Sequence, residues 1–308
     1  MMDETSVSRV RALFCEALKT DPADVLRIYE NPGRGISNDT YVIETIGGSY
    51  LLRIPGRGTD LFCNRAYECE VYARLAGTGL TDSVPYFDPE SGVKISVYIP
   101  NAHVARTNCE SDLQRAMALL RRFHEQKLRF GPANTAPDRL LYYMQCVEKV
   151  GGEAFYPDGF DAMRRAVERL RPVLYGDESA FQLVHGDGLP HNYLFPPEGD
   201  PILIDWEFAS VSMPWEDLGD FCHDGDLAPD ECVHLLALYL GRAPTQEEQA
   251  RLFGYCAAAA GMWCAWSVFK IAMEPTRREF YTDYAALGLR YANDSLAEMR
   301  RREGWTSC

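Results

Sequence analysis

The segment from His185 to Glu207 constrains this chain more than any other. It begins His-Gly-Asp-Gly-Leu-Pro-His-Asn, which spaces Asp187 and Asn192 five positions apart. Apolar runs at 181–184, 193–195 and 202–204 predict three short strands that follow one another as hairpins. Asp205 comes directly after the third run. Oxygen-bearing side chains at the mouths of consecutive hairpin strands are expected to converge in space.

These residue types suit phosphoryl transfer from ATP. A carboxylate such as Asp187 can orient an accepting hydroxyl and take its proton, while an Asn oxygen and a second carboxylate can hold Mg²⁺. Asn192 and Asp205 offer those two oxygens, and Glu207 is a further metal or water ligand. The alternative is that His, Asp and Asn only form local hydrogen bonds in a turn. Three such residues at three strand ends favour catalysis over a solvated turn.

The same residues resemble the catalytic segment of the aminoglycoside phosphotransferase and choline kinase superfamily. The similarity lies in His185 to Asn192 and in Ile204-Asp205-Trp206-Glu207, and the Asp-Phe-Gly and Ala-Pro-Glu triplets of protein kinases are absent from the sequence. The resemblance implies an α+β class and a bilobal protein-kinase-like fold. A small antiparallel-sheet N-terminal lobe would precede a larger helical C-terminal lobe, with Mg²⁺-ATP between them.

The rest of the chain has the pattern of those two lobes. Residues 1–100 are the predicted nucleotide-binding lobe, with strands at 25–30, 40–46, 49–54 and 93–99 and helices at 6–18 and 61–76. Residues 101–308 are the predicted helical lobe with the catalytic loop and the acceptor site. Its helices are expected at 110–125, 138–150, 160–174, 215–223, 229–240, 246–273 and 277–302.

A glycine-containing loop between the first two strands is the candidate phosphate cradle. Gly33 and Gly35 would let backbone amides approach phosphate oxygens, and Ser37 and Asn38 would add side-chain donors. The pattern does not complete Gly-x-Gly-x-x-Gly, so a plain loop is the alternative. The loop resembles that of bacterial choline kinases, in which a Thr-Asn or Ser-Asn pair follows the glycines.

Arg53 lies on the predicted strand 49–54, where kinases place the basic residue that grips the α- and β-phosphates. Choline kinases resemble this chain in using Arg there. A basic residue among apolar neighbours needs a carboxylate partner, and the following helix offers Glu68, with Glu70 on a different face as the second candidate. The alternative for Arg53 is a surface charge on an edge strand.

Backbone groups of Tyr98 and Ile99 are the candidate hinge contacts for the adenine edge, because they end the last predicted strand of the N-terminal lobe. Ile54 and Ile99 would cover the faces of the base. The alternative is an ordinary strand that leads into a helical domain, because such a strand has a similar sequence.

Two aromatic pairs are the candidate acceptor site. Trp263 and Trp266 are three apart on one predicted helix, and Tyr281 and Tyr284 repeat that spacing on the next. Packing between two helices explains such spacing equally well. A box of indole and phenol faces would also bind a quaternary ammonium. The two pairs are similar to the choline-binding aromatic region of choline kinases, which also implies that Asp224 is the acid facing choline.

Composition limits the partners. A net charge of −14 argues against nucleic acid, which needs clustered Lys and Arg. Ten scattered Cys without a Cys-x-x-Cys pair indicate reduced thiols in a cytoplasmic protein. The apolar run 252–269 contains Ala, Gly and Ser and is expected to be a buried helix rather than a membrane span. No obligate protein partner is evident.

The resemblance runs from Gly33 to Tyr284, and bacterial choline kinases also share Leu52-Arg53-Ile54-Pro55-Gly56. It implies ATP-dependent phosphorylation of choline, a small-molecule acceptor, with Asp187 as the base. Ethanolamine kinase, an aminoglycoside or other small-molecule phosphotransferase, and a non-catalytic choline-binding module remain as alternatives.

Overall fold

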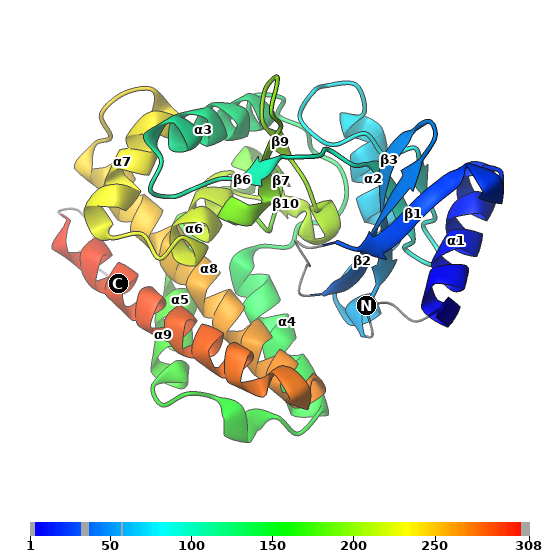
Figure 1. Cartoon of the computed structure of the whole chain (residues 1–308). Coiled ribbons are helices and arrows are strands. Elements are labelled where there is room, and N and C mark those ends of the chain that lie inside the picture. The colour runs from blue at the N-terminus through cyan, green and yellow to red at the C-terminus, as the bar shows by residue number, and fades with distance from the viewer. Residues whose placement is uncertain (1–3, 32–36, 57, 303–308) are drawn as a thin grey trace. The chain divides into compact units, whose positions relative to one another are not determined.

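The computed structural model describes residues 4–31, 37–56 and 58–302. The chain forms two compact units. The first, the sheet unit, combines Met1–Val104 with Leu194–Phe208, and the second, the helical unit, combines Ala105–Tyr193 with Ala209–Cys308. The fold is α+β, as predicted (Figure 1). The predicted division at residue 100 did not include the later segment that joins the sheet unit.

The sheet unit contains a five-stranded antiparallel sheet with the strand order β1-β2-β3-β5-β4. Its elements are α1 (Glu4–Leu18), β1 (Val25–Glu30), β2 (Asn38–Thr45), β3 (Gly48–Pro55), α2 (Arg65–Leu75), β4 (Tyr86–Phe87) and β5 (Lys94–Val97), with short 3₁₀ turns at Pro22–Asp24 and Thr59–Leu61. Helix α2 begins at Arg65 rather than at 61, because the Asn64 side chain caps it by accepting a hydrogen bond from the Tyr67 amide.

Alternation along β3 separates the core of the sheet unit from its polar face. Leu52 is fully buried with Phe14 of α1 and with Ile43 and Ile95 of the neighbouring strands. The next side chain, Arg53, must project from the opposite face of the sheet, because successive side chains of a strand alternate. β3 is flanked by β2 and β5. Arg53 therefore lies on a central strand and not on an edge.

The predicted pairing of the strands around the catalytic loop was wrong in part. β8 (Tyr193–Phe195) does lie beside β9 (Ile202–Leu203), but its other neighbour is β6 (His103–Val104). β7 (Gln182–Val184) pairs instead with β10 (Ser210–Ser212). Between β7 and β8, Gly186 has a φ of 72° and Pro190–Asn192 form a 3₁₀ turn, so this loop does not fold β8 back along β7 as a hairpin.

The helical unit is built around α8. Its helices are α3 (Glu110–His124), α4 (Ala136–Lys149), α5 (Phe160–Leu174), α6 (Trp215–Asp224), α7 (Pro229–Leu240), α8 (Gln246–Met273) and α9 (Arg278–Arg301), with 3₁₀ turns at Glu153–Phe155, Glu178–Ala180 and Pro275–Arg277. A further 3₁₀ turn, Trp206–Phe208, belongs to the sheet unit. Thr245 and Glu248 form a capping box that fixes the start of α8. Helices α4, α5, α6 and α9 all pack against α8, and α9 folds back along it (Figure 1).

Helix α8 is the apolar helix that the sequence marked as a core helix. It is long and apolar enough to cross a membrane, but the whole of its apolar window is buried inside the protein. The expectation of a buried helix is confirmed. Close approach to α9 is possible because Gly288 faces the backbone of α8: a Cβ at this position would lie 2.8 Å from the carbonyl oxygen of Ala260.

Replacing Gly288 by Ala should destabilise the helical unit. Ala favours a helix over Gly by about 1 kcal/mol, but overpacking a core typically costs about 1–3 kcal/mol, so we expect a lower free energy of unfolding in urea denaturation. The exposed Ala286 of α9 provides the control. The Ala286→Gly variant measures helix propensity alone, and a Gly288→Ala variant more stable than the wild type would show that the two helices are not in tight contact.

Candidate active site

The loop that carries Asp187 is held by a buried carboxylate of α6. Asp217 accepts hydrogen bonds from the backbone amides of His185 and Gly186, each at 2.9 Å, and from Nε2 of His124 at 3.0 Å. Burial works to raise the pKa of Asp217, but the hydrogen bond and charge of His124 and the backbone donors lower it below its usual value. Asp217 is therefore an ionised anchor for the loop.

A second anchor comes from α4. Arg139 donates to the carbonyl oxygen of Gly186 at 2.6 Å and forms a buried ion pair with Glu216. Glu216 also accepts hydrogen bonds from the Ala136 amide and the Ser212 hydroxyl. The backbone of the loop is thus held by the Asp217 carboxylate, which binds its amides, and by the Arg139 guanidinium, which binds its carbonyl oxygen.

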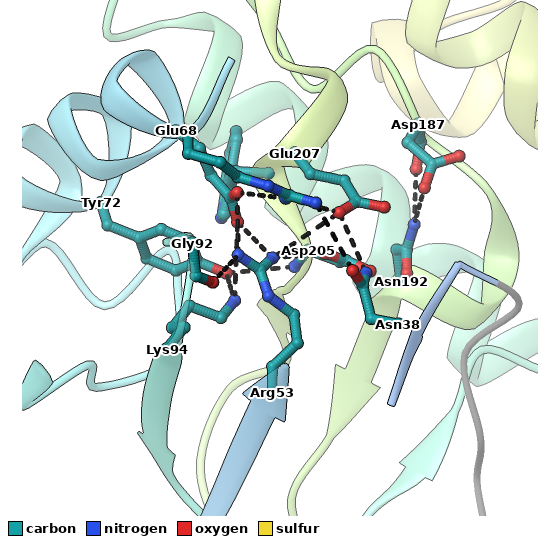
Figure 2. A network of polar contacts seen from close by, with 12 residues as sticks. Asn38, Arg53, Glu68, Tyr72, Gly92, Lys94, Asp187, Asn192, Asp205 and Glu207 are labelled. Carbon is teal, nitrogen blue, oxygen red and sulfur yellow. Dashed lines mark hydrogen bonds and ion pairs between the residues drawn. The ribbon is translucent and has the colours of Figure 1, made fainter. Parts of the chain in front are cut away.

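The structure brings Asp187 and Asn192 together within the helical unit. Asn192 Nδ2 donates to the backbone oxygen of Asp187 and to its Oδ2, both at 2.8 Å (Figure 2). Both side chains are buried. Because the amide nitrogen of Asn192 is engaged with Asp187, its carbonyl oxygen is directed away from that residue. The arrangement leaves an oxygen ligand on Asn192 and holds the Asp187 carboxylate in one orientation.

Asp205 lies in the sheet unit and has an unusual backbone. Its φ is 66°, in the left-handed region that non-glycine residues rarely adopt. Its amide donates to the Tyr72 hydroxyl at 3.3 Å, and Lys94 Nζ lies 2.5 Å from the same hydroxyl (Figure 2). The side chain of Asp205 is one-third exposed. Its convergence with Asp187 and Asn192 would join residues of different units and stays a prediction.

The predicted ion pair between Arg53 and Glu68 is present. The two guanidinium nitrogens of Arg53 bind the two carboxylate oxygens of Glu68 at 2.5 and 2.9 Å, and both side chains are buried (Figure 2). Burial works to lower the pKa of Arg53, but the charge and hydrogen bonds of Glu68 raise it above its usual value. Glu70 instead pairs with Arg74 on the exposed face of α2. The surface alternative for Arg53 is excluded, while its role in ATP binding stays a prediction.

Sequence reasoning missed the part played by Arg65. Its NH1 lies 2.8 Å from both Glu68 and Glu207, so it links the Arg53 pair to the segment that follows Asp205. Asn38 also binds Glu207, through Nδ2 at 3.0 Å. Burial and the charge of Asp205 raise the pKa of Glu207. The signal available was the position of Arg65, three residues before Glu68 on the same helix face.

The remaining nucleotide residues lie in less informative surroundings. Gly33 and Gly35 fall outside the described residues. The carbonyl oxygen of Ser37 accepts a hydrogen bond from the Gly56 amide at 3.1 Å, and a Cβ at residue 56 would collide with it. The amide of Tyr98 donates to the Ser49 carbonyl oxygen at 2.9 Å and is therefore used within the sheet unit. The contacts of Tyr98 and Ile99 with adenine stay predictions.

Three of the four predicted acceptor rings form a continuous contact. The rings of Trp263 and Trp266 meet edge to face with centroids 5.4 Å apart, and those of Trp266 and Tyr281 do so at 5.7 Å. Tyr284 joins this group through Phe280, whose ring stacks on it. The first three rings are almost fully buried. Their role in binding an acceptor stays a prediction.

Polar groups divide the aromatic cluster into two parts. Lys270, which pairs with Glu274, places Nζ 5.7 and 5.6 Å from the ring centroids of Trp266 and Tyr281. The hydroxyl of Tyr284 instead donates to Asp224 at 2.9 Å. One part of the cluster therefore already faces an internal cation, and the other faces an acid.

Within the described residues, no group of three or more His, Cys, Asp or Glu side chains is arranged to hold a metal ion by itself. Mg²⁺ beside a nucleotide is commonly bound by one or two carboxylates together with phosphate oxygens and water. The magnesium ligands expected at Asn192, Asp205 and Glu207 stay a prediction.

The chain is similar in sequence and in fold to known proteins. Protein LicA of Haemophilus influenzae is 24% identical over 281 residues, which cover 86% of this chain and 79% of LicA. The crystal structure of choline kinase LicA from Streptococcus pneumoniae has a TM-score of 0.78 at 22% identity and covers 96% of this chain and 99% of its own. A structure of LicA in complex with AMP has a TM-score of 0.69 at 21% identity, covering 90% and 92%.

These structural likenesses show the protein-kinase-like fold of the family. The model of the phosphotransferase enzyme family matches residues 29–253. That range takes in most of the β-sheet, the catalytic loop and α6, together with the first turns of α8. Because the match spans well over half of its length, the chain belongs to the phosphotransferase enzyme family.

Proposed function

We propose that this phosphotransferase moves the γ-phosphate of ATP to the hydroxyl group of choline. The observation that carries the proposal is the Asp187–Asn192 pair on a loop whose backbone is held by Asp217 and Arg139. A carboxylate fixed in this way can orient an accepting hydroxyl, and positioning supplies much of the acceleration in phosphoryl transfer. The AMP complex of a LicA structure supports the use of an adenine nucleotide.

In the proposed reaction, Asp187 accepts a hydrogen bond from the acceptor hydroxyl and takes its proton as the oxygen bonds to the γ-phosphorus. The bond from that phosphorus to the β,γ-bridging oxygen breaks, and ADP leaves. Arg53, held by Glu68, offers positive charge to the α- and β-phosphates. Ser37 and Asn38 end the predicted phosphate loop, and Asn38 is the first residue of β2.

The oxygen donors of the site fit Mg²⁺. Mg²⁺ prefers hard oxygen ligands and is commonly bound by one or two carboxylates together with phosphate oxygens. Asp205 has a partly exposed carboxylate, and the side-chain carbonyl oxygen of Asn192 is directed away from Asp187. Glu207 uses Oε2 to hold Asn38 and Arg65, so a part in metal binding would fall to its other oxygen. When bound, Mg²⁺ would neutralise charge on the phosphates.

The aromatic side chains of α8 and α9 support choline as the acceptor. Trp263 and Tyr284 both present a polar edge to an acid of α6, Asp220 and Asp224 respectively. Aromatic faces beside carboxylates attract a quaternary ammonium, which cannot donate hydrogen bonds. The similarity in fold to choline kinase LicA supports the same acceptor.

Ethanolamine is the second candidate. Lys270 lies over the rings of Trp266 and Tyr281, so these two faces already have a cation near them. Carboxylates would then contribute more to acceptor binding than a complete aromatic box, and a primary ammonium prefers carboxylates.

A panel of acceptors tests the proposal directly. We expect ADP release with choline, and less with ethanolamine, at equal acceptor concentration. Thiamine, methylthioribose and kanamycin should give no release above background, because the site is proposed to fit a small amino alcohol. Release with kanamycin alone would identify an aminoglycoside phosphotransferase. Binding of choline in calorimetry with no ADP release would identify a non-catalytic module.

The Asp187→Asn variant tests the proposed base. We expect kcat to fall by at least about 100-fold, the contribution typical of general base catalysis, with a KM for ATP within a few fold of the wild type. Asp226→Asn, which changes an exposed acid of the same unit, is the control and should retain full activity. A kcat for Asp187→Asn close to that of the wild type would remove Asp187 from the mechanism.

Neighbouring acids of α2 test the role of the Arg53 pair. Glu68→Gln removes the buried partner of Arg53, and breaking a buried pair leaves an uncompensated charge. We expect the KM for ATP to rise by roughly tenfold, the equivalent of about 1.4 kcal/mol, and the melting temperature to fall. Glu70→Gln changes the exposed pair with Arg74 and should change neither. A lower melting temperature with an unaltered KM for ATP would assign Glu68 a purely structural role.

A further inference from the structure

Helix α6 directs two carboxylates at the aromatic cluster. Asp220 Oδ1 accepts a hydrogen bond from Trp263 Nε1 at 2.9 Å, and Asp224 Oδ1 accepts one from the Tyr284 hydroxyl at 2.9 Å. The two acids are four residues apart, so they lie on the same face of the helix. One helix therefore sets the orientation of an indole on α8 and of a phenol on α9.

Asp220 is the more unusual of the two. It is fully buried, and among the described residues its Oδ2 has no hydrogen-bond partner. Leaving a buried polar atom unsatisfied costs about 1–3 kcal/mol, and more for a charged group. A carboxylate oxygen is not expected to remain in such a position unless a ligand or a proton satisfies it.

Arg139 is the positive side chain that acts on the pKa of Asp220, and its guanidinium is already bound to other groups. Arg139 works to lower the pKa of Asp220, but burial together with the charges of Glu216 and Asp217 raises it well above its usual value. The guanidinium of Arg139 is bound to Glu216 and to the Gly186 carbonyl oxygen. Burial is the main cause of the raised pKa, so a cation bound beside Asp220 would favour its ionised form.

Asp220 and the proposed catalytic base Asp187 both place negative charge at the Tyr284 phenol. Burial raises the pKa of the Tyr284 phenol, and the charges of Asp224, Asp187 and Asp220 raise it further. Three carboxylates thus act on a single ring. His191, which is half-exposed, lies 3.4 Å from Asp224. An acceptor that places its hydroxyl at Asp187 would bring its positively charged nitrogen into this acidic part of the unit.

We propose that Asp220 is a specificity-determining residue that recognises the positive charge of the acceptor. One oxygen of its carboxylate fixes the Trp263 indole, and the other faces the cationic nitrogen. This inference rests on the proposed function, because it requires an amino alcohol as the acceptor. It adds to the four rings and the Asp224 acid expected from the sequence, since it assigns the charge selection to Asp220, one turn earlier on α6.

The test compares choline with 3,3-dimethylbutan-1-ol, in which carbon replaces the charged nitrogen. Asp220→Asn keeps an oxygen that can accept the hydrogen bond of Trp263 but removes the charge. We expect the ratio of kcat/KM for choline to that for the neutral alcohol to fall by roughly 10- to 100-fold, as for a charge pair at short range in a partly buried site. The loss should lie in the KM for choline rather than in kcat.

Glu298→Gln is the matched control, because it removes another buried carboxylate of the helical unit that pairs with Arg301 and Arg302 of α9 and its end. Its acceptor ratio should equal that of the wild type. Equal losses with choline and the neutral alcohol in Asp220→Asn would show that Asp220 only supports the fold, and would overturn the proposal. If Asp220→Asn does not fold, Asp220→Ser removes the charge in its place.

The wild-type enzyme separates this inference from the proposed function. If it phosphorylates ethanolamine but not choline, the choline assignment is wrong, and the same ratio is measured with ethanolamine and propan-1-ol. A loss of charge preference in that pair would still support Asp220. If the wild type phosphorylates no amino alcohol, the proposed function and this inference are both overturned.

Discussion

The chemistry of the helical unit depends on the Asp217 carboxylate. It binds two consecutive backbone amides of the catalytic loop and a histidine of α3, His124. Hydrogen bonds to an ionised acceptor are roughly twice as strong as neutral ones. Because Asp217 lies 32 residues from His185 in sequence, the loop takes its conformation only when α6 has packed. Asp187 then gains a defined position without being part of a helix or strand.

The sheet unit positions its functional residues with buried charges. Arg53, Arg65 and Lys94 lie among Glu68, Glu207 and Asp205. Buried ion pairs contribute little net stability compared with apolar packing. This network is therefore better explained by its holding of the functional side chains in place than by a gain in stability. Left-handed backbone at a residue other than glycine costs about 1–3 kcal/mol and persists only when its surroundings impose it. The hydroxyl of Tyr72, which binds the Asp205 amide, is one such constraint.

Local patterns predicted most of the secondary structure, while long-range pairing was less accessible. The bounds of β1, α5, α7 and α8 agree with the expectations to the residue, because turn residues, prolines and caps mark their ends. The partnership of β7 with β10 was missed, since strands of three residues carry no signal for their partner. The pair Arg53–Glu68 could be predicted from charge and helix face. The contacts of Arg65 with Glu207 and of Tyr72 with Asp205 could not be assigned, because these partners lie more than 130 residues away.

The spacing of aromatic residues on α8 and α9 does not by itself distinguish a packed core from a binding site, since both place rings edge to face. The partners of the polar groups on these rings distinguish a packed core from a binding site. Lys270 lies over the rings of Trp266 and Tyr281, and its partner Glu274 accepts a hydrogen bond from the Tyr281 hydroxyl. The charges beside this half of the cluster therefore balance. The other half faces Asp220 and Asp224, and the field of Asp187 reaches it too. A cationic acceptor would be attracted to this half, and most to Asp220, because His191 already lies 3.4 Å from Asp224.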